Sequence, residues 1–372
     1  MNVQRQDRPQ PSSTDQRKFR PAVKITAVLL AVVAALALAE VSLRFVPGFT
    51  APLTPVYPKP EIKGLYSEEE LRTDLPRFTE RQGGNCIEIR HDFHWDPRFG
   101  FASKMLNKEC AKRLFAAHEK SVVLLGGSAM ENVQAPNYLT SIDTYAFGDD
   151  KSFASLNLAE SGARHSNMLS RFLYEVVELH PTYVVFLDGF NEFNAVRYGG
   201  EPDDDFYWTA GVKDRVHHPL LFLRDKLVES SRVLQLMAVS TGFISTARLV
   251  RDKVDLHLVE QAADYYVRTR GYTEAICKAY AIKCVFILQP VSLLEKSPAK
   301  AVAQINQADL ARFPFDAEVY RTGYDEILKK AGDKVLDASR LFEGHDLAYF
   351  DVVHFNKRGS KLVGDYIRSA LK

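Results

Sequence analysis

The segment SVVLLGG at residues 121–127 is a short apolar run that ends in two glycines. This pattern is typical of a strand buried in a parallel sheet, because helices cover both faces of such a strand. Four more runs of this kind follow along the chain, two of them strong and two weaker: YVVFLDG (183–189), KCVFILQP (283–290), SFASLNLA (152–159) and KVLDAS (334–339). The sequence therefore predicts five strands.

Helical segments separate these strands. Apolar residues recur at three- and four-residue intervals over 165–180, 216–250, 256–281 and 355–371, and Gly271 suggests a break in the third of these helices. Strands that alternate with helices predict an α/β domain in which helices cover both faces of a parallel sheet. In such a domain the functional residues lie in loops at the carboxyl ends of the strands.

The amino terminus has the composition of a membrane anchor. Residues 1–24 are polar and basic, and the run from Ile25 to Leu43 carries only one charge, at Glu40. As a helix this run is about 28 Å long, just enough for a bilayer core of about 30 Å. We therefore predict a cytoplasmic tail over 1–24 and a single-pass transmembrane signal anchor over 25–45.

Two alternatives to an anchor follow from the same segment. Ala37-Leu38-Ala39 fits a small-x-small cleavage site, so a cleaved signal peptide is an alternative, although the long amino-terminal region favours an uncleaved anchor. A buried core helix is disfavoured, because the run lacks amphipathic periodicity. With an anchor or a signal, the positive flank stays in the cytoplasm, so we expect the rest of the chain on the periplasmic or extracellular side of the cytoplasmic (inner) membrane.

Residues 46–118 precede the predicted sheet. Four prolines in 47–60 favour an extended tether, and 61–118 is of mixed, irregular composition. The stretch HDFHWDPRFGF (91–101) is rich in aromatic residues and is expected to pack as a cap on the main domain. Its aromatic residues indicate core packing or, as the alternative, a sugar-binding cleft: Phe93, Trp95, Phe99 and Phe101.

Composition excludes some classes of partner and leaves the cysteines open. The formal net charge is +1, so no overall field favours nucleic acid, and we expect no nucleic-acid partner. None of the four cysteines lies in a CxxC motif, which argues against a zinc ribbon. Two disulfides, Cys86–Cys110 and Cys277–Cys284 being the most local of three pairings, and four buried free thiols remain as alternatives.

Polar groups follow several of the predicted strands. Ser128 comes directly after Gly126-Gly127, where glycines let the backbone turn and let a substrate approach. A phosphate pocket or an N-cap serine would have the same local sequence. Gly162 lies after the second strand, and Asn191 lies after the third in Gly-Phe-Asn-Glu. Amide donors of this kind stabilise a tetrahedral oxyanion, although each one alone is an ordinary turn residue.

A histidine and an aspartate lie close together near the carboxyl terminus, in Asp351-Val-Val-His354. An aspartate three residues before a histidine can accept its Nδ1 proton. This leaves Nε2 free to take a proton from a serine hydroxyl. For the residues around the other motifs we expect no catalytic role. Arg164 and His165 are expected to be solvated loop residues, Glu192 to be structural and Asp188 to be a turn residue.

Together the four blocks resemble the SGNH (GDSL-like) hydrolase superfamily over residues 119–372. The resemblance implies a three-layer α/β/α, flavodoxin-like fold with no metal and no organic cofactor. It implies that Ser128 is the nucleophile and His354 the general base, oriented by Asp351. The oxyanion hole would comprise the Ser128 and Gly162 amides and the Asn191 side chain. Gly127 departs from the Gly-Asp-Ser pattern that names the superfamily, so one support of the serine turn is missing.

The expected function is a serine esterase that removes small acyl groups, in particular acetyl, from an envelope or extracellular glycan or from a small ester. An O-acetyltransferase for an exported polysaccharide uses the same chemistry with a different acceptor. A non-catalytic glycan-binding or scaffold protein on the same fold is an alternative from another class. A lipase or thioesterase would require an apolar pocket, which the segment 216–250 could cover.

Overall fold

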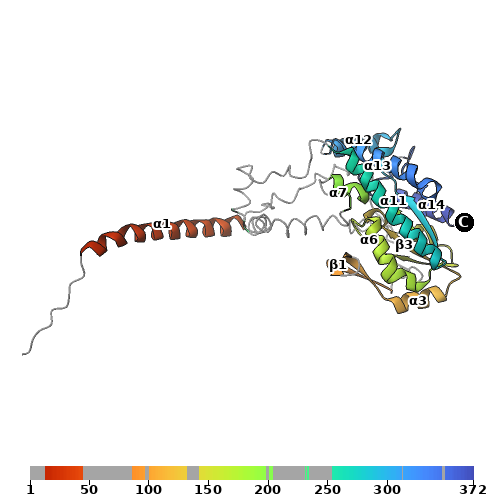
Figure 1. Cartoon of the computed structure of the whole chain (residues 1–372), viewed down its shortest axis with the longest axis horizontal. Helices are drawn as coiled ribbons and strands as arrows, with labels where there is room; N and C mark the ends of the chain where they lie inside the picture. Colours follow the sequence, from red (N-terminus) through yellow and green to blue (C-terminus); the bar gives the residue numbers. More distant parts are fainter. Residues whose placement is uncertain are drawn as a thin grey trace, which may run out of the picture. The chain divides into compact units, whose positions relative to one another are not determined.

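The computed structural model describes ten stretches of the chain (Figure 1), namely 13–44, 86–96, 100–131, 142–197, 201–203, 231, 233, 254–311, 313–345 and 348–372. They belong to two compact units. One unit draws on Met1–Tyr57 and Arg215–Arg248, and the other draws on Pro58–Asp214 and Leu249–Lys372. The second unit contains the predicted sheet.

The sheet has five parallel strands in the order β4-β3-β5-β6-β7. Their bounds are β3 Lys120–Gly126, β4 Phe153–Asn157, β5 Tyr183–Asp188, β6 Lys283–Leu288 and β7 Leu336–Asp337. This is the 2-1-3-4-5 order of flavodoxin-like sheets. All five predicted strands are confirmed. They contribute side chains that have almost no exposed surface at the centre of the core, among them Val123, Val185 and Ile287.

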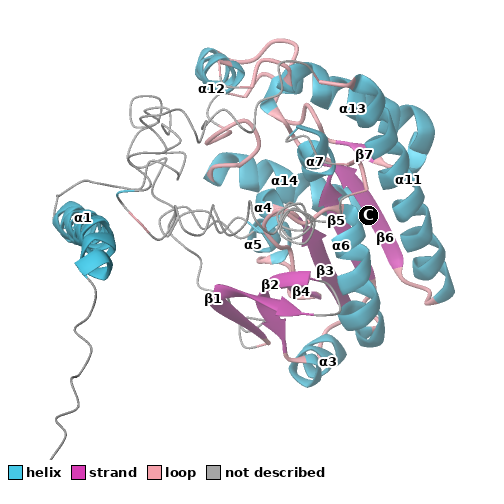
Figure 2. Cartoon of the chain, turned by 60° about the vertical axis from the view of Figure 1, so that its left-hand side comes forward, coloured by secondary structure: helices cyan, strands magenta, loops and turns pink. Residues whose placement is uncertain are grey.

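Helices cover both faces of the sheet, which confirms the three-layer α/β/α arrangement (Figure 2). On one face α11 (Leu256–Ala279) packs against α6 (His165–Arg171) and against α13 (Asp316–Ala331). On the other face α14 (Lys357–Ala370) packs against α5 (Ile142–Phe147).

Several helices differ from the sequence-based expectation. The helix predicted over 165–180 is α6 followed by a π-helical turn, Phe172–Val176, and a 3-10 turn, Val177–Leu179. The predicted break near Gly271 is wrong, because α11 is continuous through it. A glycine costs a helix only about 1 kcal/mol, which the buried face of α11 offsets. The helices α12 (Lys300–Leu310) and α13 were not predicted.

A β-hairpin replaces the irregular structure that was expected before the sheet. Strands β1 (Ile87–Asp96) and β2 (Gly100–Leu106) pair in antiparallel fashion and lead into α3 (Lys108–Ala116). Phe93, Trp95 and Phe101 belong to these strands, but their side chains lie outside the described set, as does the whole of Phe99.

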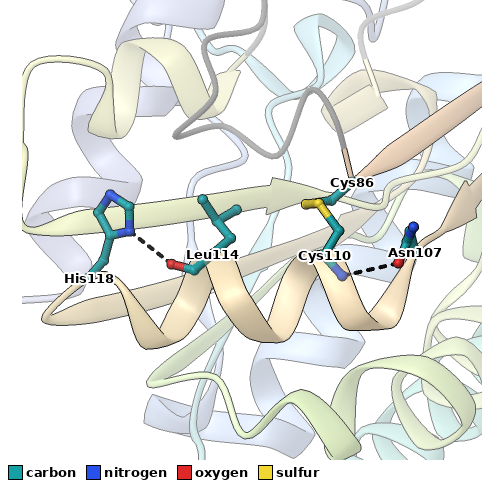
Figure 3. Close-up of a disulfide and its surroundings, with 5 residues drawn as sticks. All are labelled: Cys86, Asn107, Cys110, Leu114 and His118. Atoms are coloured by element: carbon teal, nitrogen blue, oxygen red, sulfur yellow. Dashed lines mark hydrogen bonds between the residues drawn. A yellow bond between two sulfur atoms is a disulfide. The ribbon is translucent and has the colours of Figure 1, made fainter.

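Of the alternatives left open, the most local pairing of the cysteines is present, and the alternative of four free thiols is wrong. Figure 3 shows Cys86 joined to Cys110 in the first turn of α3, where the Asn107 side chain accepts a hydrogen bond from the Cys110 N–H over 3.0 Å. The Asn107 N–H donates to the Cys86 carbonyl over 2.8 Å. The Cys277–Cys284 disulfide ties the end of α11 to the start of β6.

The other unit contains the long helix α1 (Ser13–Arg44). Its stretch Lys24–Ser42, 19 residues, is long and apolar enough to cross a membrane by length and composition. The Glu40 carboxylate accepts hydrogen bonds from the Ser231 hydroxyl and the Val233 N–H, over 2.9 and 3.1 Å. The predicted tether over 47–60, and 216–250 apart from residues 231 and 233, lie outside the described residues.

Candidate active site

Ser128 is separated from β3 by Gly127 alone, begins the short helix α4 (Ser128–Glu131) and is partly exposed. The two glycines before it are required sterically. A Cβ atom on Gly126 would collide with the Met130 side chain, and one on Gly127 would collide with Nδ2 of Asn191. The glycines therefore allow β3 to turn sharply into α4 with another side chain packed against the turn.

The side chain of Asn157, for which no role was predicted, also holds this turn. Nδ2 of Asn157, the last residue of β4, donates to the Met130 carbonyl over 3.0 Å, and its Oδ1 accepts from the Ala159 N–H over 3.1 Å. Asn157 thus joins the end of the neighbouring strand to α4. Asn157 supports the serine turn from β4. In the Gly-Asp-Ser pattern this support would come instead from an aspartate at position 127, which is a glycine in this chain.

The loop that carries Asp351 and His354 is fixed by main-chain contacts. Tyr349 and Phe355 form an isolated bridge across its base. Oδ1 of Asp351 accepts hydrogen bonds from the Val353 and His354 N–H groups, over 2.9 and 2.8 Å. The Val352 carbonyl accepts from the Ser292 N–H at 3.0 Å, which ties the loop to the segment after β6. These bonds leave Oδ2 of Asp351 directed at the histidine ring.

Ser128, His354 and Asp351 form one chain of hydrogen bonds. Nδ1 of His354 is 2.6 Å from Oδ2 of Asp351, and Nε2 of His354 is 2.8 Å from Oγ of Ser128. A carboxylate accepts only, so Nδ1 carries the proton, and Nε2 of the neutral ring accepts from the serine hydroxyl. The His354 side chain is 16% exposed, which leaves the ring accessible from one side.

The charge state of Asp351 fits this arrangement. The Asp351 side chain is 44% exposed, and the partial removal of its carboxyl group from water would by itself raise its pKa. The His354 ring and the hydrogen bonds from His354 and from the Val353 N–H favour the ionised form more strongly, so the pKa of Asp351 lies below its ordinary value. Asp351 therefore remains a carboxylate and can stabilise an imidazolium at His354.

The three expected oxyanion donors lie around the serine turn. Gly162 has a φ of +74°, a left-handed conformation that favours glycine. In the described part of the chain, neither the Ser128 nor the Gly162 N–H donates to a main-chain carbonyl. Nδ2 of Asn191 lies against Gly127 and donates to the Ala163 carbonyl over 3.0 Å. An amide nitrogen has two hydrogens, so one remains for a ligand.

Arg164 and His165 are buried, and the expectation that they are solvated loop residues is wrong. The His165 N–H donates to Oε1 of Glu192 over 2.7 Å, and Nε of Arg164 lies 3.4 Å from Oε2 of Glu192. Nδ1 of His165 is 2.6 Å from Oδ2 of Asp188, whose Oδ1 accepts from the Tyr266 hydroxyl over 2.9 Å. Asp188 is therefore a buried partner of His165 rather than a turn residue.

The structural role expected for Glu192 agrees with these contacts. Burial raises the pKa of its carboxyl group, while the adjacent Arg164 lowers it. Because Glu192 binds the residues that follow Gly162 and is itself adjacent to Asn191, it links the two loops that carry oxyanion donors.

A second buried charged group joins the hairpin to the site. Nζ of Lys104 on β2 donates to the Ala159 carbonyl over 2.8 Å, and the main-chain N–H of Lys104 donates to Oε1 of Glu160 over 3.0 Å. Nη1 of Arg171 donates to the same Oε1 over 2.6 Å, and Nη2 donates to the Lys104 carbonyl over 2.7 Å. Burial lowers the pKa of Lys104, although Glu131 and Glu160 oppose this. The sequence offered no signal for this group.

Metal ligands do not cluster in the described residues, where no group of three histidine, cysteine, aspartate or glutamate side chains could hold an ion. The polar groups near Ser128 are instead a hydroxyl, an imidazole, a carboxylate and amide donors. That combination suits acyl transfer through a serine nucleophile.

Comparison with known proteins gives structural similarity only. No family model and no curated protein matches the sequence. The structure of an acetyl xylan esterase, AlAXEase, aligns with this chain at 15% sequence identity and a TM-score of 0.35. The alignment covers 68% of this chain and 100% of the esterase. Two further structures align with 68% of this chain, each at 14% sequence identity and a TM-score of 0.36. They are a lipase/acylhydrolase from Enterococcus faecalis, covered over 95% of its length, and Axe2, an acetylxylan esterase from Geobacillus stearothermophilus, covered over 94%. Identities and scores this low assign no activity to the chain.

Proposed function

We propose that this protein is a serine esterase in which Ser128 is the nucleophile, His354 the general base and Asp351 the residue that orients the base. The observation that carries the proposal is the hydrogen-bonded chain from Asp351 through His354 to Ser128, with contacts of 2.6 and 2.8 Å. A serine that donates to a histidine, which in turn donates to a carboxylate, is activated for attack on a carbonyl carbon.

Acylation follows from these positions. Nε2 of His354 takes the Ser128 proton as Oγ attacks the ester carbonyl, and the carbonyl π electrons move to oxygen. The N–H groups of Ser128 and Gly162 and Nδ2 of Asn191 donate to that oxyanion. When the tetrahedral species collapses, the ester C–O bond breaks and the His354 imidazolium returns the proton to the departing alkoxide.

Deacylation repeats these steps with a water molecule. His354 takes a proton from water, the hydroxide attacks the acyl-serine, and Ser128 leaves as the free hydroxyl after it receives the proton. If a sugar hydroxyl replaced the water, the same site would perform O-acetyl transfer. The geometry of the described residues favours neither water nor a sugar hydroxyl as the acyl acceptor. The experiment below distinguishes the two.

The substrate class follows from the proposed location. The apolar stretch Lys24–Ser42 supports a membrane anchor, and the disulfides Cys86–Cys110 and Cys277–Cys284 support an oxidising compartment outside the cytoplasm. A membrane-held esterase in that compartment meets the acylated glycans of the cell envelope. We therefore propose small acyl groups, in particular acetyl groups on an envelope or extracellular glycan, as the natural substrate.

The test uses the full-length chain in detergent or nanodiscs. Hydrolysis of p-nitrophenyl acetate, butyrate and octanoate is measured for the wild type, for Ser128→Ala and for Ser297→Ala, which alters an exposed serine outside the site. An organophosphonate adduct is sought by peptide mass spectrometry. We expect short-chain turnover and labelling of Ser128 that only Ser128→Ala abolishes, and an added acceptor sugar distinguishes hydrolysis from transfer.

A folded wild-type protein that neither turns over any of these esters nor reacts with the phosphonate would contradict the proposal. Labelling without hydrolysis, together with acyl transfer to an added sugar, would identify an acyltransferase.

A further inference from the structure

We propose that Asn194 is a positioning residue that fixes the side-chain amide of Asn191 in the orientation in which its nitrogen faces the oxyanion, and that Tyr320 fixes Asn194 in turn. This inference rests on the proposed esterase function, since it assigns a role for two further residues in that reaction.

The orientation of the Asn191 amide decides whether it can act as a donor. Its nitrogen lies against Gly127, next to the nucleophile, and donates to the Ala163 carbonyl over 3.0 Å. Turned by 180°, the amide would place its oxygen against that carbonyl and against the developing oxyanion. Both of these groups are acceptors, so the turned amide would repel them and remove one oxyanion donor.

Asn194 holds the other end of this amide. Nδ2 of Asn194 donates to Oδ1 of Asn191 over 3.0 Å. This bond requires an acceptor at Oδ1 and so excludes the turned orientation. Asn194 is the first residue of α7 (Asn194–Arg197) and lies three residues after Asn191, at the end of the 3-10 turn Asn191–Phe193. The short helical connection keeps the two side chains side by side.

The orientation of the Asn194 side-chain amide is set by a residue of α13. The Tyr320 hydroxyl donates to Oδ1 of Asn194 over 3.3 Å, which leaves Nδ2 as the end that faces Asn191. Tyr320 is fully buried, and its ring stacks on Phe190 with centroids 4.4 Å apart and meets the Phe193 ring edge to face. Because the Tyr320 ring packs against Phe190 and Phe193, any other rotamer of Tyr320 would leave a cavity beside them.

The three bonds therefore run in one direction, from the Tyr320 hydroxyl to Asn194, to Asn191 and to the Ala163 carbonyl. Each donor polarises the next group in a chain of this kind. An amide already aligned when charge develops costs no reorganisation at that moment, which is the condition for effective oxyanion stabilisation. The relay starts at a helix 126 residues away in sequence and ends beside the nucleophile.

The test replaces the donor of Asn194 by an acceptor of the same shape. In Asn194→Asp the carboxylate repels Oδ1 of Asn191 and favours the turned amide. We expect kcat for p-nitrophenyl acetate to fall about 10²-fold, as for loss of one oxyanion donor, with KM within about threefold of the wild type. Tyr320→Phe keeps the ring packing but loses the donor, and we expect a smaller loss, roughly 3- to 10-fold, of one hydrogen bond's size.

Two readouts separate positioning from a merely structural role. A protonated aspartic acid can donate where Asn194 donates, so the activity of Asn194→Asp relative to the wild type should rise as the pH falls toward 5. In an Asn191→Ala background, Asn194→Asp should cost no further activity, because the amide through which it acts is absent. A residue that only maintained the fold would lower activity equally in both backgrounds and would lower the melting temperature in parallel.

An Asn194→Asp enzyme with wild-type kcat, or one whose loss is the same with and without Asn191, would overturn the inference. Ser128→Ala is measured beside it. Hydrolysis that survived Ser128→Ala would contradict the esterase proposal itself. An inactive Ser128→Ala enzyme beside a fully active Asn194→Asp enzyme would refute only the role of Asn194.

Discussion

His165 and Asp188 are joined over 2.6 Å, Nδ1 to Oδ2, with both side chains buried, and this separation equals that of His354 and Asp351. The two pairs differ in what Nε2 meets. In His165 it lies 2.9 Å from the hydroxyl of Thr273, which has no exposed surface and also donates to the Thr269 carbonyl over 3.1 Å. No substrate can reach that hydroxyl, so the His165–Asp188 pair holds α6 to β5, whereas His354 faces the partly exposed hydroxyl of Ser128.

Removal of His165 should therefore reduce stability. His165→Ala leaves the Asp188 carboxylate buried without its ring partner, and we expect the free energy of unfolding to fall by about 3–5 kcal/mol. Urea denaturation followed by circular dichroism measures this. His257→Ala is the control, because the His257 side chain is 70% exposed and should change stability by no more than about 0.5 kcal/mol. Equal stabilities for the two variants would refute the structural role.

Loss of the Asp351 carboxylate should abolish catalysis without unfolding the protein. Asp351→Asn offers the ring an amide that can donate, which favours the wrong tautomer of His354. We expect kcat to fall about 10³- to 10⁴-fold. Asp149→Asn, at an exposed turn, should retain wild-type kcat. Stopped-flow or endpoint assays with p-nitrophenyl acetate make the comparison, and a loss below about tenfold would show that Asp351 does not orient the base.

Gly127→Ala tests the close approach of Asn191 to the serine turn. The new Cβ atom would collide with Nδ2 of Asn191, so the amide must move, and we expect kcat to fall about 10²- to 10³-fold through one lost oxyanion donor. Gly271→Ala is the matched control, because a Cβ atom there meets nothing within 4 Å. It should leave kcat unchanged and stabilise α11 by up to about 1 kcal/mol.

The same collision would occur with an aspartate at position 127. An aspartate at position 127 would place its side chain where the Asn191 amide lies. Gly127→Asp should therefore be inactive even though it restores the pattern. Wild-type activity in that variant would show that the amide is not required at its present position.

Glu295 predicts a pH dependence of stability. Burial raises the pKa of this carboxyl from 4.5 to about 7, with the Tyr349 hydroxyl opposing the rise and Glu343 adding to it. Between these two pH values the folded state holds a proton that the unfolded chain has lost. The free energy of unfolding therefore decreases as the pH rises from about 4.5 to about 7, by on the order of 1–3 kcal/mol, and this contribution is constant above pH 7.

Glu295→Gln removes this titration. The melting temperature of the variant, relative to the wild type, should increase as the pH rises from 4.5 to 8. Burial also raises the pKa of Asp316, but Asp316 titrates alike in both proteins and cancels in the difference. Parallel curves for the two proteins would show that Glu295 ionises normally.

The sequence predicted the sheet well, because the apolar runs at 121–127 and 183–189 depend on burial on both faces, which is visible locally. The spacing of Asp351 and His354 was equally informative, since a short loop brings an aspartate to a histidine three residues later. Their approach to Ser128 was expected from the rule that loops at the carboxyl ends of parallel strands meet and from the resemblance to the SGNH superfamily.

The buried charges could not be predicted in the same way. Arg164 precedes α6 and His165 begins it, and both are buried because Glu192 and Asp188, 23 to 28 residues away, provide partners. Helix α13 was missed, although its Tyr320 reaches the site loop. In each case the deciding interaction joins residues far apart in sequence, which local patterns do not record.

The hydrogen bond between Ser128 and His354 joins residues 226 positions apart. The ribosome therefore adds Ser128 to the chain long before it adds His354. A growing chain that has already built β3 and its serine turn still lacks the histidine to which the Ser128 hydroxyl is hydrogen-bonded. Under the proposed mechanism, a chain that ends before His354 would therefore be unable to hydrolyse esters, even with β3 and the serine turn complete.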